Sequence, residues 1–274
     1  MTKLITDRTL RAYVERLSDR DVAILESLAK CTFMLTGQIQ RLHNTDASTQ
    51  TAALRATARE MKKLKEYGLV KHLGRRIGGV RAGSSSLVWY LSEAGHRLLE
   101  LDSGNKKSRK RHLEPSLNHL NHAIAVSACY VQMHEICRQN SELSLSQADT
   151  EPDCWRSYSR HGNTVQLKPD LFFATKCGGY EDRWFIEIDL ATESPTTILK
   201  KCERYHDYYK TNLEQRKHGV FPVTIWLVPD KARKEVLQTA ISETYKKGVK
   251  MFLVIMPDEL DELIARGFDA KDLC

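Results

Sequence analysis

The chain has 274 residues, with 42 Lys and Arg against 35 Asp and Glu, and a formal net charge of +7. This length is enough for two domains with separate cores, and no apolar run approaches the length that spans a bilayer. The charged N-terminus lacks the apolar segment of a signal peptide, and the 7 scattered cysteines include no Cys-x-x-Cys pair. We therefore expect a cytoplasmic protein with reduced thiols, no disulfide framework, no cysteine-based zinc site and no membrane contact.

Two helices are predicted near the N-terminus. Ser18 and Asp21 have the spacing of a capping box, which predicts a helix over 19–30. Thr36 is the expected cap of a short helix over 37–42. A third and longer helix is expected from a cap at Ser48 to about Tyr67, followed by Gly68 as the C-terminal signal. Its expected apolar face consists of Leu54, Ala58, Met61 and Leu64.

Two short apolar runs follow, over 69–73 and 87–91, and both are predicted to be strands. Between them lies the basic, glycine-rich segment GRRIGGVRAGSSS. Three helices followed by a basic hairpin are typical of a winged helix-turn-helix domain. The next segment, LSEAGHRLLEL, resembles the L-T-x-x-G step from strand to helix in winged-helix regulators.

The third helix is the expected recognition helix, because its polar face is rich in hydrogen-bond donors. In the wing, three arginines are placed to meet phosphate or a minor groove. The alternative is that all these side chains are solubilising surface charges. The candidate DNA-binding residues are Gln50, Thr51, Arg55, Arg59, Lys62 and Lys63 in the helix and Arg75, Arg76 and Arg81 in the wing.

The positive charge is concentrated in the front part of the chain. Residues 1–116 hold 22 Lys and Arg against 12 Asp and Glu, whereas the remainder holds 20 against 23. Such an imbalance favours a nucleic-acid-binding module followed by a different domain. The segment SGNKKSRKRH is expected to be a linker, which either touches phosphate or is simply solvated. The predicted organisation is a DNA-binding domain at 1–102, a basic linker at 103–116 and a second domain at 117–274.

The second domain is predicted to be a mixed sheet packed with helices, which makes the whole chain α+β. Helical patterns and apolar runs alternate along it. The expected helices cover 117–139, 196–213, 231–247 and 257–273, and the expected strands cover 143–147, 165–173, 184–190, 222–228 and 251–255.

Three acids interrupt the apolar strands of this domain. Asp170 follows Pro169, and Glu187 and Asp189 occupy alternate positions of the next strand, so they are expected to face the same side. A hairpin would bring Asp170 beside them. Carboxylates in an apolar strand need a compensating cation or donor, so the cluster is a candidate site for Mg²⁺ or Mn²⁺. A solvated strand end without any cofactor is the alternative.

This arrangement resembles the PD-(D/E)xK nuclease superfamily, with Pro169-Asp170 as the PD and Glu187 as the (D/E). The resemblance implies an α/β fold and a catalytic metal site. Asp189 stands where that superfamily has lysine, and Lys200 or Lys201 on the following helix are the candidate replacements. The candidate catalytic residues are therefore Asp170, Glu187, Asp189, Lys200 and Lys201, and a scaffold that has lost its chemistry is left open.

The segments NHLNHAIAV, EIDLATES and KKCERYHDYY, together with the winged helix and the PD strand, resemble the replication-relaxation family of bacterial plasmids and mobile elements. The resemblance implies a DNA-binding accessory protein in replication, relaxation or mobilisation. A metal-dependent DNA endonuclease and a winged-helix transcriptional regulator are the alternatives. The expected partners are double-stranded DNA and replication or mobilisation proteins, and a homodimer is left open.

Overall fold

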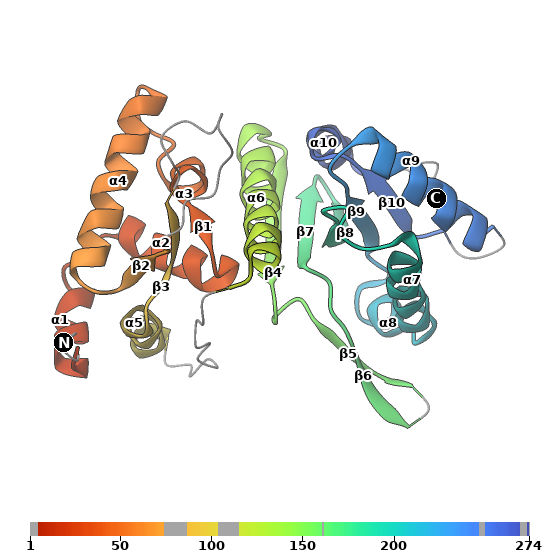
Figure 1. The fold of residues 1–274 in the computed structure, drawn as a ribbon, viewed down its shortest axis with the longest axis horizontal. Coiled ribbons are helices and arrows are strands. Elements are labelled where there is room, and N and C mark those ends of the chain that lie inside the picture. Colours follow the sequence, from red (N-terminus) through yellow and green to blue (C-terminus); the bar gives the residue numbers. More distant parts are fainter. Residues whose placement is uncertain are drawn as a thin grey trace. The chain divides into compact units, whose positions relative to one another are not determined.

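The computed structural model describes residues 5–73, 87–103, 115–160, 162–246, 250–268 and 273. Helices and strands both contribute to it, and the chain divides into two compact units, Met1–Val131 and Gln132–Cys274 (Figure 1). The division falls inside α6 (Leu117–Gln139). No helix in the described part of the chain is both long enough and apolar enough to cross a membrane.

The first unit combines helices with a small antiparallel sheet in the order β1-β3-β2. The first two residues of β3 pair with β1, and its last three pair with β2. The elements before α6 are α1 (Asp7–Val14), α2 (Asp19–Cys31), β1 (Met34–Leu35), α3 (Thr36–His43), α4 (Gln50–Glu66), β2 (Val70–His72), β3 (Val88–Leu91) and α5 (Glu93–Ser103).

The ends of these helices partly follow the predicted signals. The capping box of Ser18 and Asp21 at the start of α2 is confirmed. The cap of α4 is Thr49 and not Ser48, because the Thr49 side chain accepts from the backbone N–H of Ala52. Helix α1 has no counterpart among the predicted elements, although the Thr6 side chain caps it by accepting from the N–H of Thr9.

The buried face of α4 starts one residue earlier than the predicted apolar face. The buried residues are Ala53, Thr57, Met61 and Leu64, which recur at helical spacing. Leu54 is 38 % exposed and Ala58 is also exposed. With this face buried, the outward face of α4 includes Thr51, Arg55, Arg59 and Lys62.

The second unit is built on a five-stranded mixed sheet in the order β10-β9-β8-β7-β4. Neighbours β8, β9 and β10 run parallel, whereas β4, β7 and β8 pair antiparallel. The elements after α6 are β4 (Leu143–Thr150), β5 (Arg156–Arg160), β6 (Asn163–Leu167), β7 (Leu171–Cys177), β8 (Tyr180–Ile188), α7 (Pro195–Lys210), α8 (Leu213–His218), β9 (Val223–Leu227), α9 (Lys231–Thr244), β10 (Phe252–Ile255), the 3₁₀ turn η1 (Pro257–Glu259) and α10 (Leu260–Arg266).

One predicted strand is in fact two. The run over 165–173 is broken after Leu167, and β7 starts only at Leu171, beyond Pro169, which has no N–H to donate. The first part pairs with β5 in a separate hairpin that extends away from the main sheet (Figure 1). The predicted helix over 196–213 likewise ends early, because Asn212 takes a left-handed conformation that separates α7 from α8.

The core of the second unit lies between its sheet and helices α7 and α9. Phe172 and Phe185 from the sheet, Tyr205 from α7 and Leu237 from α9 belong to one cluster of fully buried side chains. Burial of such large side chains is the main stabilising contribution in a domain of this kind. Helix α7 is therefore fixed directly over the strands that contain the predicted acids.

Candidate functional site

Most of the predicted DNA-binding residues of α4 are exposed. Gln50, Thr51, Arg55, Arg59 and Lys62 all have solvent-facing side chains, and Lys62 lies 3.9 Å from Glu66 one turn later. The predicted wing residues Arg75, Arg76 and Arg81 fall within 74–86, outside the residues that the structure describes. The predicted DNA-binding residues that the structure describes therefore lie along one helix, α4.

Lys63 differs from its neighbours because it is bound to another helix. Its ammonium group forms an ion pair with the Asp21 carboxylate, which is only 1 % exposed. Burial acts to raise the pKa of Asp21, but the hydrogen bonds from Lys63 and Ser18 outweigh it and lower that pKa. Lys63 therefore holds α4 against the start of α2, and a role in packing accounts for it.

Pairing of β7 with β8 brings two of the predicted acids together. The N–H of Asp170 donates to the carbonyl oxygen of Ile186 at 3.1 Å, and the N–H of Ile188 donates to Asp170 Oδ2 at 2.7 Å. These bonds hold the Asp170 carboxylate beside the strand that contains Glu187. The Asp170 charge is close enough to raise the pKa of Glu187.

Glu187 is buried and bound by two residues of α7. The Tyr205 hydroxyl donates to Glu187 Oε1 at 2.6 Å, and the Lys201 ammonium lies 3.9 Å from Oε2. Burial, followed by the charge of Asp170, raises the pKa of Glu187 to about 8, although Lys201 and Tyr205 oppose the shift. The carboxyl group therefore holds its proton far more tightly than an exposed glutamate does.

Of the two candidate lysines, Lys201 is the one that reaches the acids. Its ammonium lies 3.1 Å from Glu193 Oε2 and contacts Glu187, while 36 % of its side chain is exposed. Burial acts to lower the pKa of Lys201, but Glu187 and Glu193 outweigh it and raise that pKa. Lys200 is exposed on the same helix, and no ion pair with an acid is found for it among the described residues.

Asp189 does not join the pair. Strand β8 ends at Ile188, and Asp189 turns to Arg233 of α9, with Nε 2.5 Å from Oδ2 and Nη2 3.1 Å from Oδ1. Its Oδ1 also accepts from the N–H of Ala191. The expected cluster of three acids is therefore a pair, Asp170 and Glu187. Asp189 instead forms an ion pair with Arg233 that joins the end of β8 to α9. Among the described residues, no group of three or more Asp, Glu, His or Cys is arranged to hold a metal ion.

Two carboxylates can still hold Mg²⁺ when waters and a phosphate complete its coordination, so Asp170 and Glu187 are compatible with such an ion. Binding it would first require Glu187 to lose its proton.

Two residues that contact the predicted acids, Tyr205 and Arg233, have no role among the sequence-based predictions. The i, i+4 spacing of Lys201 and Tyr205, which places both on one face of α7, is the signal that links them to a common site.

These features define a class of protein with two units that combine helices and strands. The first unit presents the basic helix α4, and the second buries the carboxylates of Asp170 and Glu187 beside Lys201. The sequence model of the replication-relaxation family matches residues 25–224, from within α2 into β9. The chain belongs to the replication-relaxation family, as its sequence motifs indicated, and membership indicates a role in replication or relaxation. No curated protein and no solved structure is found to match it.

Proposed function

We propose that this chain is a DNA-binding accessory protein in the replication, relaxation or mobilisation of a plasmid or other mobile element. Its first unit would be a winged helix-turn-helix that docks on duplex DNA through α4, and its second a PD-(D/E)xK-like scaffold. The observation that supports this most is the row of exposed cations, Arg55, Arg59 and Lys62, on one long helix. Three cations on a helix surface are suited to contact successive phosphates of one groove.

The order of elements in the first unit supports the same proposal. Helix α3, a turn and α4 are followed by β2 and β3, and β1 completes the sheet. The turn is held by Asn44, which is 2 % exposed and donates to Thr57 Oγ1 at 2.9 Å and to Glu60 Oε2 at 2.7 Å. Buried polar contacts of this kind fix the angle between two helices, as a helix that reads a groove requires.

The test compares two sets of arginine and lysine substitutions in the full chain. Replacing Arg55, Arg59 and Lys62 with Ala should weaken binding to duplex DNA by about one to two orders of magnitude at low salt. The control replaces Arg8, Arg11 and Arg16, which are exposed on or just after α1 and contribute the same charge. Fluorescence anisotropy of labelled duplex DNA measures both. Equal losses in the two variants would show that net charge, and not α4, determines the affinity.

A second function, metal-dependent DNA cleavage, is supported by the convergence of Asp170, Glu187 and Lys201. Lys201 approaches Glu187 from α7 and supplies the positive charge that the strand lacks at Asp189. Hydrolysis would add one water oxygen to phosphorus, break one P–O ester bond and pass a proton to the leaving oxygen. Lys201 would stabilise the negative charge that develops on the phosphate, and Mg²⁺, when bound, would neutralise phosphate charge.

Supercoiled plasmid incubated with the full chain and Mn²⁺ or Mg²⁺ tests this second function. Cleavage should yield nicked or linear plasmid, should be lost in Glu187→Gln and should be strongly reduced in Lys201→Ala. Lys200→Ala is the matched control, because this neighbouring lysine is exposed. Plasmid that stays supercoiled with every ion, while the same preparation binds DNA, would leave DNA binding as the function and exclude cleavage.

A further inference from the structure

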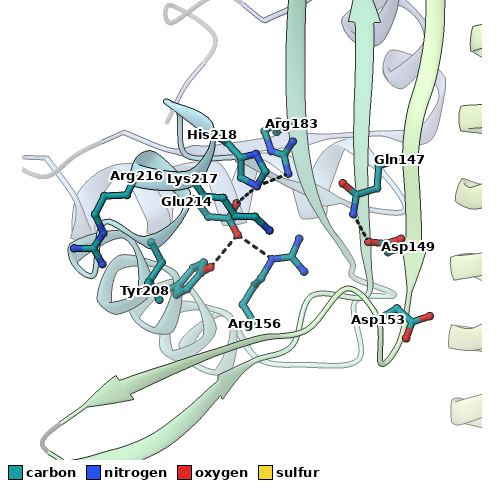
Figure 2. A pocket seen from close by; sticks show the side chains of 11 residues that line it. Gln147, Asp149, Asp153, Arg156, Arg183, Tyr208, Glu214, Arg216, Lys217 and His218 are labelled. Atoms are coloured by element: carbon teal, nitrogen blue, oxygen red, sulfur yellow. Dashed lines mark hydrogen bonds and ion pairs between the residues drawn. The ribbon is translucent and has the colours of Figure 1, made fainter. Parts of the chain in front are cut away.

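A cavity of about 610 Å³ lies in the second unit, apart from the acid pair. It is bordered by α8, the start of β5 and parts of β4 and β8, and none of its lining residues is Asp170, Glu187 or Lys201 (Figure 2). Its size falls within the range of pockets that hold small organic ligands.

One wall of the cavity is cationic, and Arg156 is fixed there before any ligand arrives. Its Nε donates to Glu214 Oε1 at 2.8 Å, its Nη1 donates to the carbonyl oxygen of Cys154 at 2.8 Å, and its guanidinium lies 4.6 Å from the centre of the Phe172 ring. Within the described part of the chain, no hydrogen bond involves Nη2. A guanidinium held in this way presents its remaining donors to a ligand at little entropic cost.

Arg183 adds a second fixed cation to this wall. Its side chain is 6 % exposed, its Nη1 donates to Glu181 at 2.6 Å, and its Nη2 donates to His218 Nε2 at 3.2 Å. Because an arginine can only donate, His218 must accept with an unprotonated Nε2. Burial and the charge of Arg183 both lower the pKa of His218, in agreement with a neutral ring.

Lys217 completes the cationic wall at the rim. It is exposed on α8, and no ion pair is found for it among the residues that the structure describes. The carboxylate on the same side, Glu214, is already engaged, because its Oε1 accepts from Arg156 and from the Tyr208 hydroxyl. Arg156 and Arg183 are each paired with a carboxylate, Glu214 and Glu181, so the excess positive charge of this wall is that of Lys217.

The opposite wall presents two acceptor groups, the amide oxygen of Gln147 and the carboxylate of Asp149. Gln147 Nε2 donates to Asp149 Oδ2 at 2.6 Å, and among the residues that the structure describes no hydrogen bond is found for the amide oxygen of Gln147 or for Asp149 Oδ1. Figure 2 shows these two side chains across the cavity from Arg156, Arg183 and Lys217. A ligand that satisfies both walls must be anionic at one end and rich in N–H donors at the other.

We propose that this cavity binds one nucleotide unit, with its phosphate against Arg156 and Lys217 and the N–H donors of its base towards Gln147 and Asp149. Inorganic phosphate would satisfy only the cationic wall, and a nucleoside only the acceptor wall. A nucleotide has both groups at opposite ends and fits a cavity of this volume. The unit is supplied either by a free nucleotide or by an unpaired end of a DNA strand.

The test titrates the full chain with adenosine, cytidine and thymidine monophosphates, with adenosine, with inorganic phosphate and with a trinucleotide, followed by calorimetry. Monophosphates should bind more tightly than adenosine or inorganic phosphate. Lys217→Gln should weaken this binding about two- to fivefold. Lys246→Gln is the matched control, because Lys246 is exposed and lies outside the cavity. Asp149→Asn should change the preference between adenosine and thymidine monophosphates, because it exchanges an acceptor for a donor.

The two sources of the nucleotide are separated by the same titrations. Monophosphates that bind as tightly as the trinucleotide indicate a free nucleotide, and a clear preference for the trinucleotide indicates a strand end. No binding of any of these probes at millimolar concentration would overturn the proposal. Equal binding of inorganic phosphate and monophosphates, or binding that Lys217→Gln leaves unchanged, would also overturn it. None of these outcomes depends on duplex binding by α4, which is measured separately.

Discussion

At the scale of single residues, Gly95 shows how closely two backbone segments of the first unit approach each other. A Cβ at this position would lie 2.2 Å from the carbonyl oxygen of Leu69, which itself accepts from the N–H of Ser92 at 2.9 Å. The Ser92 hydroxyl in turn accepts from the N–H of Gly95 at the start of α5. This explains physically why the segment LSEAGHRLLEL needs glycine at its fifth position.

Gly95→Ala should therefore lower the free energy of unfolding of the first unit by about 2–3 kcal/mol, because backbone must move to admit the methyl group. Gly37→Ala is the control, since a Cβ on this helical glycine meets nothing within 4 Å. That change should be neutral or stabilising by up to about 1 kcal/mol. Urea unfolding followed by circular dichroism measures both. A Gly95→Ala variant as stable as Gly37→Ala would contradict the close approach.

Lys62 and Lys63 are adjacent lysines with different expected roles. Lys63→Ala leaves the Asp21 carboxylate, 1 % exposed, without its cation and should lower the free energy of unfolding by about 2–4 kcal/mol. Lys62→Ala should change stability by less than about 0.5 kcal/mol, because its contact with Glu66 is exposed. The order should be reversed for DNA affinity, which Lys62→Ala should lower more than Lys63→Ala does. Thermal unfolding and anisotropy on the same two variants decide this.

The buried carboxyl of Glu187 makes the stability of the second unit depend on pH. Its pKa is raised from an ordinary 4.5 to about 8 in the folded state, so the folded state binds a proton that the unfolded chain releases. The stabilisation is present in full below the unfolded pKa and is lost as the pH rises through the folded pKa. Glu187→Gln should remove this dependence while keeping an acceptor for the Tyr205 hydroxyl.

The variant should be about as stable as the original chain near pH 5 and more stable near pH 8.5, by on the order of 1–3 kcal/mol. Other titrating groups are common to both proteins and cancel in the difference. Melting temperatures recorded across this pH range provide the measurement. A constant difference between the two proteins would show that Glu187 is ionised throughout.

At the scale of elements, the start of α6 belongs to the first unit. Leu120 is 1 % exposed and packs with Phe33 and Val88, and the Ser127 hydroxyl donates to the carbonyl oxygen of Phe33 at 2.6 Å. The side chain of Gln38 donates to the carbonyl oxygen of Ile124 at 2.9 Å. A basic unit that ends before α6 would therefore lose part of its core.

Two fragments test this assignment. Residues 1–131 should fold and bind duplex DNA, whereas residues 1–116 should be less stable by about 2–4 kcal/mol, because the Leu120 side chain and its neighbours leave a cavity. Denaturant unfolding and anisotropy compare the two fragments directly. If the shorter fragment unfolds at the same denaturant concentration as the longer one, α6 is not part of this unit.

At the scale of the whole molecule, the sequence predicted what depends on local pattern. The apolar runs that became β8, β9 and β10 and the capping box of α2 are short-range signals, and the structure has each of them. Strand β5 has no predicted counterpart because RSYSR is mostly polar, and the end of β6 lies within the predicted strand over 165–173, whose pairing with β5 no local pattern indicates. Asp189 was assigned to the acid cluster because its partner, Arg233, lies 44 positions away and no local pattern joins them.

The unequal charge of the two units predicts how the DNA affinity of each depends on salt concentration. Residues 1–131 hold 22 Lys and Arg against 12 Asp and Glu, whereas the rest of the chain holds 20 against 23. Each phosphate that a protein neutralises adds about 0.9 to the slope of log affinity against log salt concentration. The first unit should therefore account for nearly the whole slope. The slope of the full chain should exceed that of the 1–131 fragment by no more than about 0.9, which is the contribution of one phosphate bound by the second unit. Anisotropy titrations of both proteins over a range of salt concentrations provide the two slopes. A full-chain slope about twice that of the fragment would show that cations of the second unit contact the DNA backbone despite its negative balance.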